Sequence, residues 1–136
     1  MKLGKMLVDA NIFLEILLGQ KKSEACKDIL RKIEAGEIRA FVSSFTIDTV
    51  ILSMTRNKVS LQKVKIFLES LRNIKGLRWY NINFQDRLIA LEHMKKYNLD
   101  YEDAITLQSA ISSSCKEILS LDKHFDKIKE VKRISP

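Results

Sequence analysis

Short apolar runs alternate with helix-forming segments along the whole chain, and this alternation constrains the fold more than any other feature. The first run, Met6-Leu7-Val8, leads directly into Asp9, after which apolar residues recur at helical spacing. Strands that alternate with helices predict a mostly parallel sheet with helices on both faces. Such strands are buried on both sides, which accounts for their continuous apolar composition. We therefore expect an α/β fold, a three-layer α/β/α sandwich with a central sheet of four to five strands.

The expected elements fill the chain with few gaps. The sequence predicts strands at residues 6–9, 39–43, 77–82, 117–121 and 131–134. It predicts helices at residues 10–18, 23–36, 46–56, 60–73 and 101–114, and a long helix that begins at Asn83 or Asp86. Ser23 and Ser60 are the expected N-caps of their helices. With 136 residues, one proline and four glycines, the chain has the size of one domain and little room for linkers. We expect a single domain over residues 1–136.

Composition excludes several classes of protein. No apolar run approaches the roughly 18 residues that a membrane-spanning helix needs, so no membrane partner is expected. The amino end lacks the small-residue cleavage site of a signal peptide. Cys26 and Cys115 lie far apart and form no CxxC pair, so we expect reduced thiols in a cytoplasmic protein.

Acidic residues follow several of the predicted strands. In open α/β sheets, functional sites form at the carboxyl ends of the strands. The acids at or near such positions are Asp9, Asp48, Asp103, Asp122 and Asp126. Carboxylates crowded into one pocket raise each other's pKa, and a divalent cation removes that conflict. Oxygen ligands favour Mg²⁺ or Mn²⁺, which can activate water against a phosphodiester.

Each of these residues also has a plain structural explanation. Asp9 is a suitable N-cap for the helix that follows it, and Asp48 can cap a helix or face solvent. Asp103 in a first helical turn favours the helix dipole. Asp122 can cap a turn at 123–125, and Asp126 fits a surface position. Three polar residues, Asn11, Ser43 and Ser44, could orient a carboxylate or a water, although turn and cap roles are common for serine.

The positive charge is unevenly distributed. The net charge is +7, and residues 55–80 hold seven Lys and Arg against one acid, Glu69. This stretch would attract a polyanion, with Arg56, Lys58 and Lys63 as candidate RNA contacts. A solvated helix face explains the same pattern without any ligand.

Four segments together resemble the PIN-domain ribonucleases, in particular the small VapC-type proteins. "VDANIF" is similar to the family's first strand with its acid and following Asn, and "VSSFTIDTVI" to its second segment with an acid on a helix. "LDYEDAITLQSA" resembles its Asp-Ala helix, and "ILSLDKHFDKI" its closing segment. The motifs keep the family's order over nearly the whole chain.

The resemblance implies a Mg²⁺- or Mn²⁺-dependent endoribonuclease. Asp9, Asp103 and Asp122 would be metal ligands, with Asp126 as an accessory acid at the metal and Asp48 in the family's second acidic position. Ser120 would match the Ser or Thr that precedes the last acid. Resemblance to VapC-type toxins also implies a homodimer and an antitoxin partner.

One departure from the family leaves alternatives open. The family usually has Glu where this chain has Asp48, and Thr49 competes for the aligned position. A non-catalytic RNA-binding or scaffold module of the same fold is therefore the main alternative. Haloacid-dehalogenase chemistry would need a second acid where Asn11 stands. A receiver domain would need paired early acids, and metal-free cleavage would need His93 and His124 to converge, which their segments do not predict.

Overall fold

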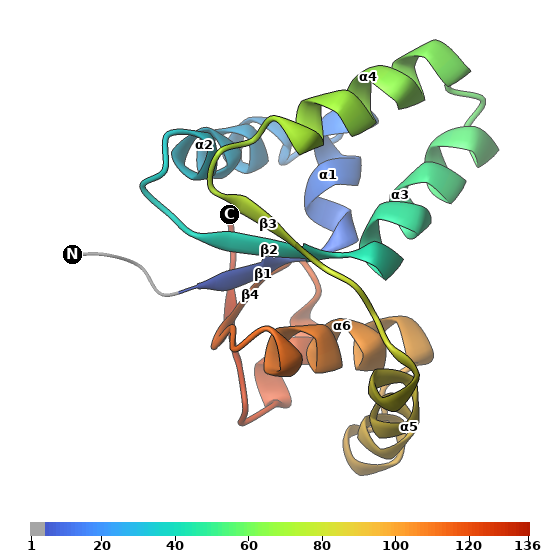
Figure 1. Cartoon of the computed structure of the whole chain (residues 1–136), viewed down its shortest axis with the longest axis vertical. Coiled ribbons are helices and arrows are strands. Elements are labelled where there is room, and N and C mark those ends of the chain that lie inside the picture. The colour runs from blue at the N-terminus through green and yellow to red at the C-terminus, as the bar shows by residue number, and fades with distance from the viewer. Residues whose placement is uncertain (1–4) are drawn as a thin grey trace.

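The computed structural model describes residues 5–136, and this part of the chain forms five strands and six α-helices (Figure 1). The strands are β1 (Met6–Val8), β2 (Ala40–Ser43), β3 (Leu77–Tyr80), β4 (Glu117–Leu119) and β5 (Lys132–Ile134). The helices are α1 (Ala10–Leu17), α2 (Ser23–Glu34), α3 (Ser44–Arg56), α4 (Leu61–Arg72), α5 (Phe84–Tyr97) and α6 (Tyr101–Ser112). A short 3-10 turn, η1 (Lys123–Lys127), precedes the last strand.

The strands form one sheet in the order β3-β2-β1-β4-β5, and every pairing is parallel. Strand β1 lies in the centre, where Met6 pairs with Ala40 of β2 and with Glu117 of β4. Because all strands run in the same direction, their carboxyl ends share one edge of the sheet. Asp9, which follows β1 directly, lies at the middle of that edge. The predicted fold class is confirmed.

Each face of the sheet packs against its own helical layer (Figure 1). Met6 and Val8 of β1 belong to the core formed with α1 to α4, which includes Phe13 and Phe67. Leu7, between them, belongs to the core on the other face. This alternation follows from the two-residue side-chain period of a strand. The sheet is thus the middle layer of an α/β/α sandwich.

The second core brings α6 and η1 against the sheet. Ala104 and Ala110 of α6 are fully buried, and their small side chains allow the helix to approach β1 closely. Phe125 of η1 is also fully buried in this core. The start of α6 and the turn after β4 are therefore fixed on the same side of the sheet, close to its carboxyl edge.

Several helices are capped by the polar residue that follows or ends a strand. Asp9, Ser43 and Asn83 accept backbone N–H bonds at the starts of α1, α3 and α5. Asn83 and Asp86 form a reciprocal capping box, so both predicted starts of this helix contribute to its N-terminus. The predicted cap at Ser23 is wrong, because α2 already includes that residue and its N-cap is Lys22, without a side-chain bond.

A buried polar network joins α5 to α6 and β3. Asp86 is 3% exposed, and its carboxylate accepts hydrogen bonds from Tyr80 (2.5 Å) and Ser112 (2.7 Å). Gln108 donates to the same carboxylate at 3.3 Å, and its own oxygen lies 2.8 Å from the ring of His93. These bonds satisfy the buried charge and hold the two helices together. The contact with Gln108 explains the position of the His93 ring without a catalytic role.

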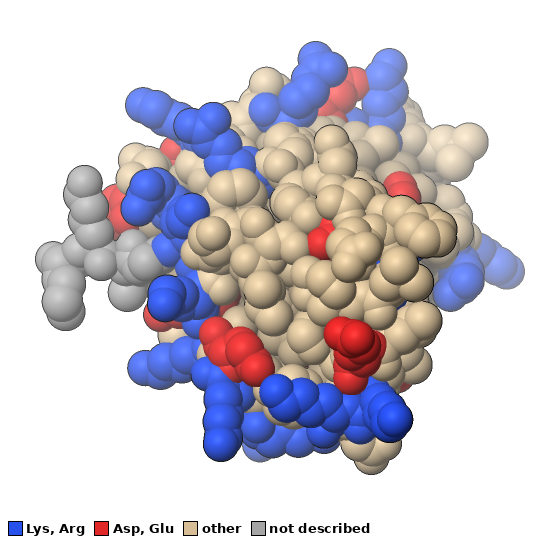
Figure 2. Space-filling view, turned by 60° about the horizontal axis from the view of Figure 1, so that its bottom comes forward, with Lys and Arg blue, Asp and Glu red and all other residues tan. Residues whose placement is uncertain are grey.

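Viewed from the side of α5 and α6, the surface has a broad area with few charged side chains, bordered by Lys and Arg (Figure 2). The largest exposed apolar groups of α5 are Phe84, Leu88 and Leu91, which recur at the spacing of one helix face.

Within residues 5–136, no helix has the length and apolar composition needed to cross a membrane.

Candidate metal centre

The carboxylate of Asp9 is held at the end of β1 by three donors. Its Oδ1 accepts the N–H of Ala10 at 2.7 Å, which is the N-cap bond of α1. Its Oδ2 accepts the hydroxyl of Ser120 at 2.7 Å and the amide of Asn11 at 3.3 Å. Asp9 is 6% exposed, and this burial raises its pKa to about 6 although the bonds from Ser120 and Ala10 oppose the rise. The Asp9 carboxylate therefore both caps α1 and lies at the candidate site.

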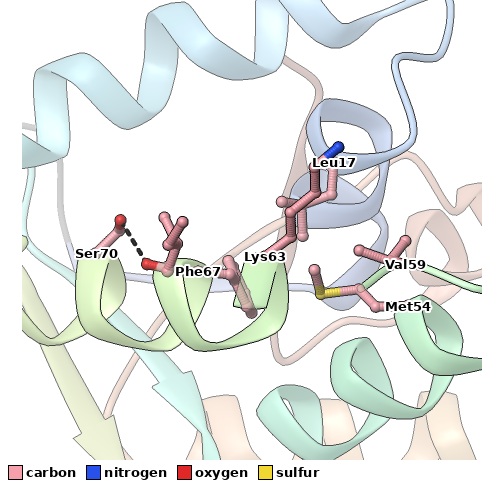
Figure 3. A pocket seen from close by; sticks show the side chains of 7 residues that line it. Leu17, Met54, Val59, Lys63, Phe67 and Ser70 are labelled. Atoms are coloured by element: carbon pink, nitrogen blue, oxygen red, sulfur yellow. Dashed lines mark hydrogen bonds between the residues drawn. The ribbon is translucent and has the colours of Figure 1, made fainter. Parts of the chain in front are cut away.

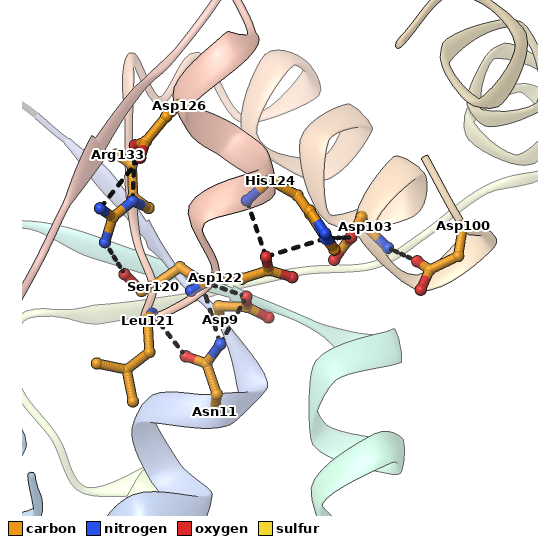
Figure 4. A network of polar contacts seen from close by, with 10 residues as sticks. All are labelled: Asp9, Asn11, Asp100, Asp103, Ser120, Leu121, Asp122, His124, Asp126 and Arg133. Carbon is orange, nitrogen blue, oxygen red and sulfur yellow. Dashed lines mark hydrogen bonds and ion pairs between the residues drawn. The ribbon is translucent and has the colours of Figure 1, made fainter. Parts of the chain in front are cut away.

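Asn11 and Ser120 fasten the carboxyl ends of β1 and β4 to each other. The Asn11 amide donates to the Ser120 hydroxyl at 3.2 Å, and its oxygen accepts the Leu121 N–H at 3.2 Å. The same Ser120 oxygen accepts the N–H of Asp122 at 2.9 Å. Two side chains thus set the distance between Asp9 and the segment that carries Asp122 (Figure 4).

The first turn of α6 supplies the next carboxylate. Asp100 caps the helix by accepting the Asp103 N–H at 2.8 Å, and Asp103 itself is 7% exposed. Burial is the main reason that the pKa of Asp103 rises to about 7, and the negative charge of Asp122 adds to it. At neutral pH this group is poised between its two protonation states. A cation beside it would stabilise the ionised form.

Asp122 and His124 complete the cluster. Asp122 caps η1 by accepting the N–H of His124 at 2.9 Å. The ring Nδ1 of His124 lies 3.1 Å from Oδ2 of Asp103 and 3.1 Å from Oδ1 of Asp122 (Figure 4). These contacts raise the pKa of His124, chiefly through the bond to Asp103. Potential ligand atoms of the three residues all lie within 4.8 Å of one another.

Further acids lie around this cluster. The pKa of Glu102 is raised by desolvation and by the charges of Asp100 and Asp122. Glu102 and Asp122 in turn contribute to the raised pKa of Asp9. Five carboxylates from the ends of β1 and β4 and the start of α6 thus influence one another. Such a donor set is suited to a hard divalent cation, which offsets the repulsion among them.

The structure leaves two of the sequence-predicted acids outside this cluster. Asp126 forms an ion pair with Arg133, whose Nε and Nη2 lie 2.7 and 3.3 Å from its two oxygens, and this pairing lowers the pKa of Asp126. In Figure 4 this pair lies apart from Asp103 and His124. Asp48 is exposed on α3, and its side chain has no hydrogen bond or ion pair within residues 5–136. The hydroxyl of Ser43 caps α3 through the Thr46 N–H at 3.0 Å.

The basic stretch is divided by the fold. Arg56 ends α3, Lys58 follows in a turn with a φ of 59°, and Lys63 lies in the first turn of α4. Lys75 and Arg78 instead line a hollow of about 360 Å³ with Lys5, Arg39 and Phe41, at the amino ends of the strands. The first group lies on the α3–α4 hairpin and the second lies at the edge of the sheet opposite Asp9.

His124, Asp100 and Glu102 lie at the site but were not predicted from the sequence. The segments of His93 and His124 do not predict that the two rings converge, but an Asp that caps a turn folds the chain back over its own carboxylate. That local signal was available at Asp122. The two acids lie in "LDYEDA", within one turn of Asp103, and the same first turn brings them to the site.

The model of the PIN domain family matches residues 6–131, and the chain belongs to this family. No curated protein matches the chain as a relative.

Solved structures of several proteins share the fold at low sequence identity. VapC20 of Mycobacterium tuberculosis, described as a sarcin–ricin loop cleaving toxin, is 13% identical with a TM-score of 0.72 over 93% of this chain and 98% of its own. DNA-bound VapBC of Salmonella typhimurium is 15% identical with a TM-score of 0.70 over 98% of both chains. A toxin–antitoxin complex of Klebsiella pneumoniae is 20% identical with a TM-score of 0.67 over 93% of this chain and 94% of that chain.

Proposed function

We propose that this protein is a metal-dependent endoribonuclease that hydrolyses RNA phosphodiester bonds. The observation that carries the proposal is the cluster of Asp103, Asp122 and His124, whose potential ligand atoms lie within 4.8 Å of one another. Asp9 lies at the same edge of the sheet, and the charge of Asp122 contributes to its raised pKa of about 6. Carboxylates crowded in this way are suited to a cation and unfavourable without one. Membership of the PIN-domain family supports the same assignment.

In this proposal the three aspartates hold Mg²⁺ or Mn²⁺, directly or through water. The bound cation supplies a Lewis acid that activates water and stabilises the leaving oxygen of the phosphodiester. Asn11 and Ser120 orient the Asp9 carboxylate through their hydrogen bonds of 3.3 and 2.7 Å. The reaction requires no protein nucleophile. Arg56, Lys58 and Lys63, on the α3–α4 hairpin, are the proposed contacts to the RNA backbone.

Cleavage of a labelled RNA in the presence of Mn²⁺ tests the proposal. We expect Asp9→Asn to lower the cleavage rate by about a hundredfold or more, because the amide removes a ligand charge at the cation. Asp126→Asn is the matched control, since its carboxylate is paired with Arg133. It should retain the wild-type rate within about threefold if Asp126 takes no part in binding the cation. Unchanged cleavage by Asp9→Asn would refute the mechanism.

We further propose that the protein is the toxin of a toxin–antitoxin pair. This proposal is supported by the shared fold of a chain in a solved toxin–antitoxin complex and of a chain in a solved VapBC complex. An apolar groove of about 310 Å³ between α1, α3 and α4 is the proposed antitoxin site (Figure 3). Its lining residues are Leu17, Met54, Val59, Lys63, Ile66, Phe67 and Ser70. Ile66, in this mostly apolar groove, is 56% exposed. A protein partner that covers the groove would remove this apolar surface from water. Lys63 at the groove would complement an acidic group of that partner.

A homodimer through α5 is also proposed. Phe84, Leu88 and Leu91 are 76%, 47% and 55% exposed on one face of this helix. A second copy that covers this stripe would remove apolar surface from water without covering Asp9 at the end of β1. Both protomers of the dimer would keep Asp9, Asp103 and Asp122 accessible to RNA.

One observation favours the second candidate function, a non-catalytic RNA-binding module. The acid of α3, Asp48, is exposed and lacks a polar partner within residues 5–136, whereas the family usually carries Glu in this segment. In that case RNA binding would persist and Mn²⁺ would not bind. Filter binding of RNA at several salt concentrations, run beside the cleavage assay, separates the two candidates.

A further inference from the structure

His124 lies with its ring against the two carboxylates that come from different elements of the site. Its Nδ1 is 3.1 Å from Oδ2 of Asp103 on α6 and 3.1 Å from Oδ1 of Asp122 at the start of η1. The other histidine, His93, lies on α5 with its ring nitrogen 2.8 Å from Gln108. Of the two imidazoles, only that of His124 is within reach of the proposed cation.

The backbone of η1 determines the position of this ring. Asp122 accepts the His124 N–H at 2.9 Å and thereby starts the turn. Phe125, the next residue, is fully buried in the core beneath α6. The turn is therefore fixed at both sides of His124. The side chain is 67% exposed, so it extends over the carboxylates from the solvent side and not from the core.

We infer that His124 is a nitrogen ligand of the proposed cation and makes the site selective for Mn²⁺ over Mg²⁺. This inference rests on the proposed function, because it assigns a further ligand to the same cation. Imidazole is a good ligand for borderline transition metals, whereas Mg²⁺ is bound through oxygen and retains several waters. A neutral imidazole beside Asp103 and Asp122 also adds a donor without adding to the repulsion among the carboxylates.

The competing explanation is a charged imidazolium that only forms an ion pair with Asp103 and Asp122. An imidazolium has protons on both nitrogens and has no lone pair for a metal. A bound cation would then displace the ring, and nitrogen would be absent from the coordination shell. Mn²⁺ separates these explanations, because its pulsed electron paramagnetic resonance spectrum detects a directly bound nitrogen.

The experiment uses the full chain with Mn²⁺ in three forms: wild type, His124→Gln and, as the matched histidine control, His93→Gln. We expect nitrogen modulation from bound Mn²⁺ in wild type and His93→Gln, and its loss in His124→Gln. The dissociation constant for Mn²⁺ should rise about tenfold or more in His124→Gln. The constant for Mg²⁺, measured by competition against Mn²⁺, should change by less than about threefold. The melting temperature without metal shows that each variant is folded.

Three results would overturn the inference. Bound Mn²⁺ without nitrogen modulation in the wild type leaves the carboxylate site intact and removes His124 from it. Modulation that persists in His124→Gln assigns the nitrogen to another group. A wild-type protein that binds no Mn²⁺ refutes both the ligand role of His124 and the proposed metal-dependent function.

Discussion

The carboxylate of Asp9 accepts a 2.7 Å hydrogen bond from the hydroxyl of Ser120, which lies 111 positions later in the chain. The bond joins the carboxyl ends of two neighbouring parallel strands, β1 and β4. Ser120 is fully buried and also accepts the N–H of Asp122 at 2.9 Å. The Ser120 side chain thus connects the acid after β1 to the acid after β4, so a change at Ser120 is expected to affect both.

Replacement of Ser120 by alanine tests that coupling. Without the hydroxyl, Asp9 loses a bond that stabilises its ionised form, so its pKa rises further above about 6. We expect the affinity for Mn²⁺ near neutral pH to fall about tenfold. Calorimetric titration at several pH values checks this, because the loss should become smaller as pH increases. A loss of affinity independent of pH would indicate a purely steric role for Ser120.

The metal-free protein should become less stable as pH rises. The folded-state pKa of Asp103 is about 7 and that of Asp9 about 6, both above the unfolded value of 3.8, so the folded state binds more protons between these limits. The free energy of unfolding therefore falls as pH rises from about 4 to about 7. The raised pKa of His124 acts in the same direction, because its stabilising contact with Asp103 is lost when the ring loses its proton.

Asp103→Asn should reduce this pH dependence. The uncharged amide removes the cost of burying an ionised carboxylate and also the repulsion with Asp122. Without metal at pH 8 we therefore expect a gain of about 1 kcal/mol in the free energy of unfolding, or roughly 3 °C in melting temperature. Thermal unfolding at a series of pH values without divalent cations measures the difference. Parallel pH profiles for wild type and variant would show that Asp103 does not carry the shift.

Asp48 provides a test of the second acidic position. Because its side chain is exposed and has no polar partner within residues 5–136, Asp48→Ala should leave Mn²⁺-dependent RNA cleavage within about threefold of wild type. The rate at saturating Mn²⁺ is the quantity to compare. A loss approaching that expected for Asp9→Asn would show that the acid of α3 enters the site when RNA is bound.

The proposed homodimer depends on the apolar stripe of α5. Leu88→Arg places a charge in the middle of that stripe and should convert a dimer to a monomer, since an unpaired charge is costly in an apolar interface. Sedimentation velocity measures the change in mass. The matched control is Leu52→Arg, an equally exposed leucine on α3 at 51%, which should remain dimeric. A wild-type protein that sediments as a monomer would refute the proposed dimer.

The sheet and the positions of its acids followed from local pattern, because buried strands and capped helices leave clear sequence signals. "MLV" followed by Asp9 identified both β1 and the edge where the cluster forms. The structure was needed to show that Asp126 turns to Arg133, because that pairing depends on the side-by-side packing of η1 and β5. The contact of the His124 ring with Asp103 likewise depends on η1 packing under α6, a contact between distant segments that spacing does not reveal, whereas its contact with Asp122 follows from the local turn.

The central claim is that the converging carboxylates bind a divalent cation in the folded protein. The most direct test is the melting temperature of wild type and Asp103→Asn with and without millimolar Mn²⁺. A ligand at a hundredfold excess over its dissociation constant adds about 2.7 kcal/mol to the free energy of unfolding. We expect a clear rise in the melting temperature of wild type that is absent in Asp103→Asn. Equal melting temperatures of wild type with and without Mn²⁺ would contradict the binding of a cation by these carboxylates.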